Sequence, residues 1–283
     1  LREVEVVARE VVPMLSCEAE GIGIIAPYNA QVNALRDAVD EHIDVATVHK
    51  FQGREKEAII MSAVDDSVTE FSDDPNLLNV AVSRARQRFC LVVSGNEQCR
   101  ESNISDLLAY IRYNECAISE SNIRSIFDLL YDRYAEARKM YLKKHKRISE
   151  YDSENLTFAM LEDVIEEFPA YRHLGIVCHY PLRQLLREVT SLAEDDRAYA
   201  LHPATHIDFL LYNRISKRPV LAIETDGYGF HKPGTAQSIR DDRKNRILAV
   251  YGIPLLRLST VGSGERERVR IALLGEIRSG LSE

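Results

Sequence analysis

The sequence predicts an α/β fold built from two successive domains. In residues 1–95, short apolar runs alternate with amphipathic stretches, and a second alternation begins after Tyr151. Continuous apolar strands separated by helices are typical of a sheet that helices cover on both faces, and we expect a parallel sheet in the first half. We therefore predict a first domain at residues 1–118, a helical connector at 119–149 and a second α/β domain at 150–283.

The elements of the first half follow from the spacing of its apolar residues. Val32, Leu35 and Val39 recur on one helical face, whereas short continuous apolar runs indicate buried strands. The expected elements, in chain order, are a helix at residues 3–15, a strand at 21–26, the helix of Val32, strands at 45–48 and 58–64, a polar loop at 65–75, a helix at 76–85 and a strand at 89–93.

The connector carries apolar side chains at helical spacing over residues 123–146, which predicts that it is helical throughout. Its end, RKMYLKKHKR at residues 138–147, holds six basic residues and no acidic one. Two interpretations are open. The segment is either a solvated helix end whose charge complements the helix dipole, or a surface that contacts phosphate groups.

The second domain begins with an amphipathic helix that Ser153 is expected to cap. Its apolar face includes Leu156, Met160, Val164 and Phe168. The further expected elements are strands at residues 175–180, 206–212 and 220–225, a helix at 238–251 and a strand at 253–258.

Bulk composition limits the class of protein. The net charge of −8 argues against a charge-driven binder, but it allows a nucleic-acid enzyme with a local basic surface. No apolar run is long enough to span a bilayer and no secretory leader is visible, so we expect no membrane partner. The five scattered cysteines form no CxxC pair, which disfavours a zinc ribbon or a disulfide framework and suits the cytoplasm. Leu1 stands where an initiator methionine would, so we expect the chain to start inside a longer protein.

Three segments of the first half occur in a fixed order: IGIIAPYNAQVNAL at residues 22–35, ATVHKFQGREKEAIIMSAV at 46–64 and LLNVAVSRARQRFCLVV at 77–93. Together they resemble motifs IV, V and VI of superfamily 1 helicases, especially the Upf-like branch. The resemblance implies a RecA-like second motor domain that binds ATP together with a first motor domain. The sequence has no GxxxxGK[ST] phosphate loop. We therefore expect half an ATP site, with ATP bound only in the intact helicase and the missing first motor domain as a partner.

Roles for individual residues follow from the motif match. Arg84 of SRAR matches the arginine finger, whose planar, permanent charge suits phosphate oxygens, and Arg86 is a second candidate. Gln52, Gly53 and Glu55 match the turn that faces the nucleotide. The candidates for contacts with the nucleic-acid backbone or the nucleotide are Tyr28, Gln31, Thr47 and Lys50.

A second constellation lies in HIDFLLYNRISKRPVLAIETDGYGFHK at residues 206–232. It places Asp208 in one expected strand and Glu224 in the next. A short connection between them brings the two strands side by side, so that both carboxylates converge at one edge and hold Mg²⁺ or Mn²⁺, hard cations that prefer oxygen ligands. Glu224 and Asp226 share one strand face because side chains alternate along a strand.

This region resembles the PD-(D/E)xK nucleases, and within them the group around the very-short-patch repair endonucleases. The match lies in IETDGYGFH at residues 223–231 and in RDDRKNRILAVYGIPLLRL at 240–258, and it implies a restriction-endonuclease-like domain. Asp226 stands where the superfamily has lysine. Two replacements are open: Lys244 extends its ammonium into the site, or His231 acts as the base. With His231 as the base, Asp208 and the Thr225 carbonyl bind the metal, assisted by Glu224 and Asp226.

The first helix of the second domain adds an acidic candidate. Glu154 matches an acidic residue that is often found there, and Glu162 is the alternative. His202 and His206 of HPATH are a weaker zinc hypothesis, because Pro203 breaks the helical spacing and no cysteine lies nearby.

The combined hypothesis is the C-terminal part of an ATP-dependent DNA helicase with a metal-dependent, endonuclease-like domain, acting in DNA repair or defence. The alternative is a catalytically inactive nuclease fold that docks the helicase on DNA. A third interpretation, an RNA-directed motor, arises because the Upf-like branch includes RNA helicases.

Overall fold

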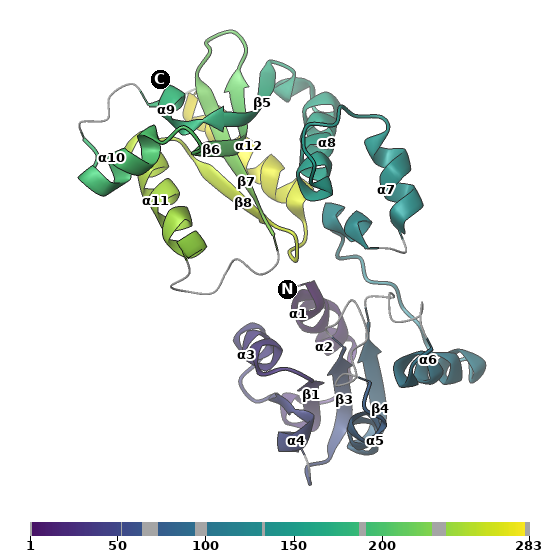
Figure 1. Cartoon of the computed structure of the whole chain (residues 1–283). Helices are drawn as coiled ribbons and strands as arrows, with labels where there is room; N and C mark the ends of the chain where they lie inside the picture. The colour runs from purple at the N-terminus through teal and green to yellow at the C-terminus, as the bar shows by residue number, and fades with distance from the viewer. Residues whose placement is uncertain are drawn as a thin grey trace. The chain divides into compact units, whose positions relative to one another are not determined.

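A computed structural model of the chain describes residues 2–51, 53–63, 73–93, 101–131, 134–186, 191–227 and 236–280. The chain forms two compact units (Figure 1). The first comprises Leu1–Arg124 with Tyr131–Arg133, and the second comprises Ser125–Leu130 with Tyr134–Glu283. Each unit contains one four-stranded sheet flanked by helices, which confirms the predicted α/β class.

The sheet of the first unit is wholly parallel, as predicted, with strand order β2-β1-β3-β4. Its strands are β1 (Ile22–Ala26), β2 (Asp44–Thr47), β3 (Lys56–Ser62) and β4 (Ala85–Val92). β1 is buried over its whole length, as expected for a central strand that helices cover on both faces. Gly23 permits close packing there, because a Cβ atom would come within 2.5 Å of the Phe51 ring.

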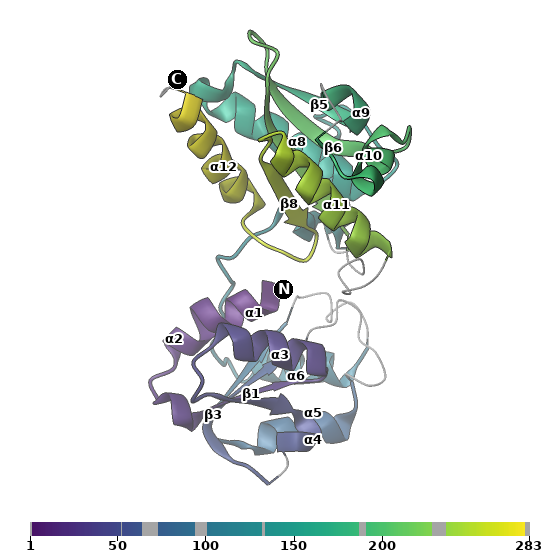
Figure 2. The ribbon, with the colours of Figure 1, turned by 90° about the vertical axis from the view of Figure 1, so that its left-hand side faces the viewer.

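Helices cover both faces of this sheet (Figure 2). Ile24 of β1 packs toward the helices before and after β1, whereas its neighbour Ile25 packs toward the helices on the other face. This is the alternation that a strand imposes. The first face is covered by α1 (Arg2–Val6), a π-helix (Val7–Val11), α2 (Val12–Met14) and α3 (Asn29–Ala38), and the second by α4 (Val48–Phe51), α5 (Pro75–Ser83) and α6 (Asn103–Tyr113). A short 3-10 helix (Ala19–Gly21) leads into β1.

The second unit has a mixed sheet of order β5-β6-β7-β8. Its strands are β5 (Leu174–Pro181), β6 (His206–Asn213), β7 (Pro219–Asp226) and β8 (Leu255–Ser259). β5, β6 and β7 pair antiparallel, and β8 joins β7 in parallel. The expected side-by-side pairing of the strands that carry Asp208 and Glu224 is therefore present.

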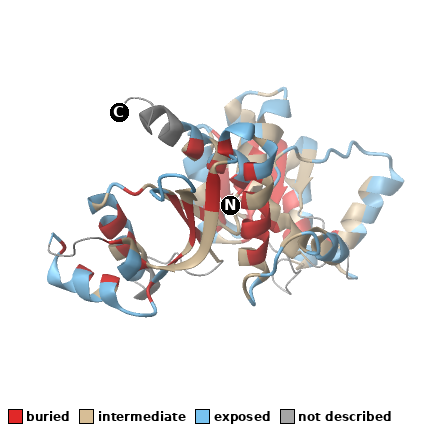
Figure 3. Cartoon of the chain, turned by 90° about the horizontal axis from the view of Figure 1, so that it is seen from above, coloured by how far each residue is buried: buried red, intermediate tan, exposed pale blue. Residues whose placement is uncertain are grey.

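Two apolar clusters hold the helices of the second unit against its sheet. The buried residues lie mainly in the strands and on the sides of the helices that face them (Figure 3). α8 (Asp152–Glu167) and α12 (Glu265–Gly280) pack on one face, and a short 3-10 helix (Pro169–Tyr171) that follows α8 packs there too. α9 (Leu182–Leu185), α10 (Glu194–Leu201) and α11 (Ala236–Val250) pack on the other.

The connector differs from the prediction of a continuous helix. The segment contains a 3-10 helix (Ile126–Leu130) and α7 (Ala135–Leu142), and both belong to the second unit. The Ser125 hydroxyl accepts the Phe127 amide at 3.0 Å, and the Asp128 carboxylate accepts the Ser125 amide at 3.0 Å. These local side-chain bonds satisfy backbone donors in a tight turn, which competes with a longer helix.

The predicted cap of the first helix of this unit is wrong. α8 begins at Asp152 with Tyr151 as its N-cap residue, so Ser153 already lies in the first turn. The preceding loop is held instead by Asn155, whose side-chain oxygen accepts the amides of Ile148 and Ser149 at 2.9 and 3.1 Å. Within the described ranges, no helix is both long enough and apolar enough to cross a bilayer.

Candidate functional site

The helicase-like residues of the first unit lie at two edges of its parallel sheet. Tyr28 follows β1 and Thr47 ends β2, and the register pairs Ala26 with Thr47, so both lie at the carboxyl edge. Lys50 is exposed on α4. Gln31 is only 4% exposed, and its amide nitrogen donates to the Ser62 hydroxyl at 3.2 Å, which fastens α3 to the end of β3.

The candidates for the nucleotide lie at the opposite edge, where β3 and β4 begin. The Lys56 amide donates to the Arg84 carbonyl at 3.0 Å, and Arg86 Nε donates to a Glu55 oxygen at 3.1 Å. The structure therefore brings the turn of Gly53 and Glu55 beside Arg84 and Arg86. Gly53 has a φ of +83°, which favours glycine. Gln52 lies outside the described residues.

Arg84 is suited to donate hydrogen bonds to a phosphate oxygen of a ligand. It ends α5 directly before β4. Its Nε is buried with no hydrogen-bond partner among the described atoms, and its Nη2 donates only to the neighbouring Ser83 hydroxyl at 3.4 Å. A buried N–H group that lacks a partner carries a desolvation cost that an anionic ligand would relieve.

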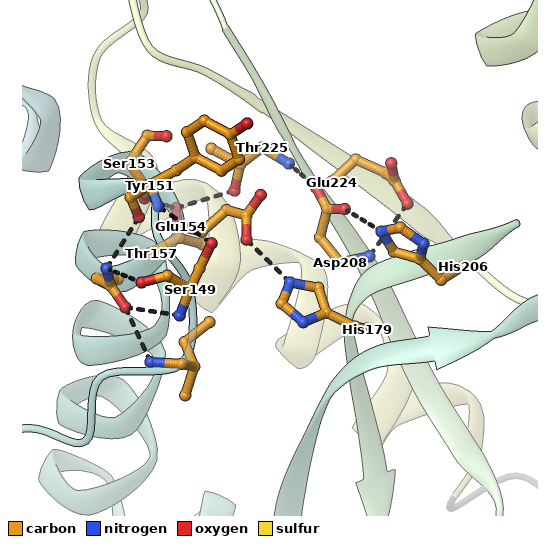
Figure 4. A network of polar contacts seen from close by, with 12 residues as sticks. Ser149, Tyr151, Ser153, Glu154, Thr157, His179, His206, Asp208, Glu224 and Thr225 are labelled. Carbon is orange, nitrogen blue, oxygen red and sulfur yellow. Dashed lines mark hydrogen bonds and ion pairs between the residues drawn. The ribbon is translucent and has the colours of Figure 1, made fainter. Parts of the chain in front are cut away.

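In the second unit, Asp208 and Glu224 lie side by side at the same end of the β6–β7 hairpin (Figure 4). The Thr225 amide donates to Asp208 Oδ2 at 2.9 Å, and the Asp208 amide lies 3.4 Å from Glu224 Oε1. Glu224 is 5% exposed. The predicted convergence of two carboxylates on adjacent strand ends is therefore what the structure has.

Lys244 enters this site from α11. Its Nζ donates to Glu224 Oε2 at 2.6 Å, and the residue is 8% exposed. Lys244, one of the two replacements that the sequence left open, therefore reaches the Glu224 carboxylate. His231 lies outside the described residues. Asp226 is paired with another cation: Arg257 Nη1 of β8 donates to its Oδ1 at 2.9 Å.

Two histidines and a third carboxylate extend the site toward α8 (Figure 4). His179 Nε2 lies 2.9 Å from Glu154 Oε2, and His206 Nε2 lies 3.9 Å from Asp208 Oδ1. The two imidazole rings meet edge to face with centroids 5.4 Å apart. His179 has a φ of +50°, a backbone conformation that is uncommon outside glycine and concentrates at functional sites.

The choice between the two acidic candidates of α8 follows from these contacts. Glu154 joins the site through His179, whereas Glu162 pairs with His145 at 2.9 Å, away from the hairpin carboxylates. The sequence did not point to His179, because its role depends on strand register. His179 lies between the paired residues Cys178–Phe209 and Tyr180–Ile207 of β5 and β6, and therefore opposite Asp208.

Glu154, His206, Asp208, Glu224 and Lys244 line a cavity of about 690 Å³. Its described walls mix both signs of charge, with Asp208, Glu224, Asp226 and Glu154 facing Arg240, Arg243 and Lys244. His202 and His206 also line it, but His202 Nδ1 accepts the Ala204 amide at 3.2 Å and no cysteine is among the lining residues.

A divalent cation such as Mg²⁺ needs several oxygen ligands. Among the described residues, no group of three or more His, Cys, Asp or Glu side chains is arranged to hold a metal ion. Mg²⁺, however, is usually bound through one or two carboxylates while it keeps several waters. The carboxylates of Asp208 and Glu224 with the Thr225 carbonyl supply oxygens of that kind, and they fit such a water-rich site.

Burial changes the acidity of both carboxyl groups. Burial, together with the nearby Asp208 carboxylate, raises the pKa of Glu224 to about 7 against the opposing charge of Lys244. Burial also raises the pKa of Asp208, and the hydrogen bond from the Thr225 amide opposes it. Both groups must be ionised to bind a cation, so cation binding and proton release are coupled.

We expect this acidity to give the cation-free chain a measurable pH dependence of stability. The folded state binds the Glu224 proton more tightly than the unfolded state, whose ordinary pKa is 4.5. The stability contribution is therefore complete below pH 4.5 and is lost as the pH rises through 7, by about 3 kcal/mol. Urea unfolding in EDTA across this range should show a fall that Glu224→Gln removes. If the free energy of unfolding changes with pH in the same way for the wild type and for Glu224→Gln, the raised pKa of Glu224 is contradicted.

Comparison with known proteins separates the two halves. Residues 1–98 match a family described as AAA domain, and residues 148–277 match a family described as a protein of unknown function (DUF2726). An uncharacterized ATP-dependent helicase of Methanocaldococcus jannaschii is 47% identical over 77 residues, which cover 26% of this chain and 11% of that protein.

Two further relatives show the same pattern. The DNA polymerase alpha-associated DNA helicase A of Schizosaccharomyces pombe is 40% identical over 28% of this chain and 13% of its own length. The regulator of nonsense transcripts 1 homolog of Arabidopsis thaliana is 33% identical over 42% of this chain and 10% of its own length. The chain therefore spans only about a tenth of each relative. These matches, with the parallel sheet, support a superfamily 1 helicase part in the first unit.

Proposed function

We propose that this chain is part of an ATP-dependent DNA helicase whose second unit is a metal-dependent nuclease, acting in DNA repair or defence. The relatives named as helicases and the motif residues of the first unit support the motor part. The nuclease part is supported chiefly by one observation: Asp208, Glu224 and Lys244 meet in a single polar cavity. Because Lys244 supplies the ammonium that the motif position of Asp226 lacks, the constellation retains two carboxylates and one cation.

The residues of the cavity have distinct roles in the proposed phosphodiester hydrolysis. Asp208, Glu224 and the Thr225 carbonyl would hold Mg²⁺ or Mn²⁺, which when bound polarises the scissile phosphate and lowers the pKa of a bound water. Lys244 orients Glu224 and places positive charge beside the phosphate oxygens. Glu154 holds His179 at the rim of the site, while His231 remains our proposed base from the sequence.

The alternative is a nuclease fold that binds DNA without cutting it. The ion pairs Lys244–Glu224 and Arg257–Asp226 favour this alternative in one respect, because both already neutralise site carboxylates within the protein. An RNA substrate is a third possibility, since one relative is named as a regulator of nonsense transcripts.

Incubation of the chain with plasmid DNA, single-stranded DNA and single-stranded RNA, without ATP, tests the proposal. In Mg²⁺ or Mn²⁺ we expect DNA cleavage, and in EDTA none. Binding in both conditions without cleavage in either would refute the nuclease and support the docking module. Preferential cleavage of RNA would change the substrate class.

The motor part predicts that the chain alone does not hydrolyse ATP, because its sequence lacks the phosphate loop. In the intact helicase, Arg84→Ala should lower the ATPase rate by about 10³-fold or more, since an arginine finger stabilises the transferring phosphoryl group. A steady-state ATPase assay measures this effect. Arg124→Ala, on a 68% exposed side chain paired with Glu120, is the control and should leave the rate unchanged. If both variants hydrolyse ATP at the same rate, Arg84 does not act in the ATP site.

A further inference from the structure

A dense group of cations lies on α7 and the loop that follows it. Lys139, Lys143, Lys144, Lys146 and Arg147 are all exposed. No ion pair joins any of the five to a carboxylate within the described residues, and Arg147 donates only to the carbonyls of Ser149 and Glu150. We call these five residues the basic track. In a chain with a net charge of −8, such a local excess of unneutralised charge attracts an anionic polymer.

The other polar residues of this segment fix it in place. Arg138 donates to the carbonyls of Leu129 and Leu130 at 2.8 and 2.9 Å and pairs with Asp152 at 3.0 Å. On the inner side of α7, the Tyr141 hydroxyl donates to Asp163 at 2.6 Å, and His145 lies 2.9 Å from Glu162. The segment therefore uses Arg138, Tyr141 and His145 for anchoring, and the part of the chain that the structure describes gives the track residues no carboxylate partner.

The loop between the basic track and α8 is equally well held. Asn155 is 3% exposed, and its amide nitrogen donates to the carbonyls of Ser149 and Tyr151 at 3.0 and 2.9 Å. This loop presents the Tyr151 ring, which is 68% exposed. An aromatic ring that stays exposed on a rigid loop is a platform on which a nucleic-acid base can stack.

Tyr151 and the loop that joins it to the track lie at the start of α8, whose Glu154 lines the cavity of the second unit. Tyr151 precedes Glu154 by less than one helical turn (Figure 4). Lys146, at the end of the track, lies close enough to Cys178 of β5 for its positive charge to oppose the effect of burial, which raises the pKa of that thiol to about 11. The loop that Asn155 holds therefore leads from the basic track to Tyr151, just before Glu154 in the cavity wall.

We propose that the basic track and Tyr151 bind a single nucleic-acid strand, with phosphates on the lysines and a base on the tyrosine ring, and lead that strand to the cavity. This inference rests on the proposed function, because it takes a phosphodiester as the occupant of the cavity. A single strand fits better than a duplex, because only unpaired bases are free to stack on an exposed ring.

The test measures binding of labelled single-stranded DNA to the full chain in EDTA, so that cutting does not interfere. The triple variant K143Q/K144Q/K146Q removes three cations of the track. The matched control R214Q/K217Q/R218Q removes three exposed cations from the turn at the opposite end of the β6–β7 hairpin. Thermal melting of each variant checks its fold.

We expect the track variant to weaken binding at least tenfold at low salt, whereas the control binds as the wild type does. Each lost phosphate contact should reduce the slope of log K against log salt by about 0.7, so the slope should fall by about 2. Tyr151→Ala should weaken single-strand binding at least about fivefold, leave the salt slope unchanged and leave duplex binding unaffected.

If the track and control variants lose the same amount of affinity for single-stranded DNA, or if neither loses any, the proposal is overturned. A duplex preference that Tyr151→Ala does not change would overturn the single-strand part. The two proposals fail separately. If the chain binds DNA through the track but does not cut DNA in Mg²⁺ or Mn²⁺, the nuclease proposal is refuted and the proposal for the basic track stands. If the wild-type chain cuts DNA and the track variant binds and cuts DNA equally well, only the proposal for the basic track is refuted.

Discussion

Asp208→Asn is expected to lower DNA cleavage by about 10³-fold or more while the chain stays folded. A metal-bound phosphoryl group gains several kcal/mol of charge stabilisation in the transition state, and the substitution removes one of the two carboxylates proposed to hold the metal. Asparagine keeps the shape of the side chain, and its carbonyl oxygen can still accept the Thr225 amide that Asp208 accepts at 2.9 Å. Because burial raises the pKa of Asp208, the neutral replacement should not reduce stability.

The matched control is Asp195→Asn. Asp195 lines the same cavity, but its side chain is 84% exposed and its nearest described cation is Arg243 at 3.6 Å. Rates of cleavage under single-turnover conditions should separate the two variants, with Asp195→Asn close to the wild type. If Asp208→Asn cuts as fast as Asp195→Asn, the carboxylate pair of β6 and β7 is not the catalytic centre.

Lys244→Met is expected to destabilise the second unit strongly at pH 8. Lys244 Nζ lies 2.6 Å from Glu224 Oε2, and the two side chains are 10% and 7% exposed. Removal of one partner leaves a buried carboxylate without its cation, which costs about 3 kcal/mol and on the order of 10 °C in Tm. Lys139→Met removes an exposed lysine of α7 and should leave the Tm unchanged.

The double variant Glu224→Gln, Lys244→Met separates stability from chemistry. A buried ion pair replaced as a whole is close to neutral for stability, so the double variant should recover most of the lost Tm. It should nevertheless remain inactive in cleavage, because both proposed roles are gone. If Lys244→Met has the same Tm as the wild type, the Lys244 ammonium does not occupy the buried position beside Glu224 in solution. If the double variant cuts DNA, neither residue is needed for the reaction.

The sequence predicted the strands well where burial alone dictates the pattern. β1 and β3 read as short apolar runs and are central strands of the parallel sheet. β6 and β7 were predicted as neighbours, since a short connection leaves a hairpin as the simplest pairing. The connector was predicted poorly, because helical spacing between residues 123 and 146 does not distinguish a long helix from short turns whose apolar residues pack on α8.

Parts of the site depend on tertiary contacts that no spacing encodes. The choice of Lys244 required the packing of α11 against β7, so the sequence offered it only as one of two replacements. His179 became visible only through the antiparallel register of β5 and β6. The resemblance implied that Asp226 assists the metal when His231 is the base, and no spacing showed that Arg257 of the neighbouring strand would pair with Asp226.

The position of the metal can be measured directly by protein cleavage with Fe²⁺ in place of Mg²⁺. With ascorbate and peroxide, a bound Fe²⁺ ion generates hydroxyl radicals that cut the polypeptide nearby. We predict cuts at β6 near Asp208 and at β7 near Glu224 and Thr225, suppressed by excess Mg²⁺ and absent from Asp208→Asn. Cuts elsewhere in the chain, or the same cuts in Asp208→Asn, would contradict a divalent cation held between these two strand ends.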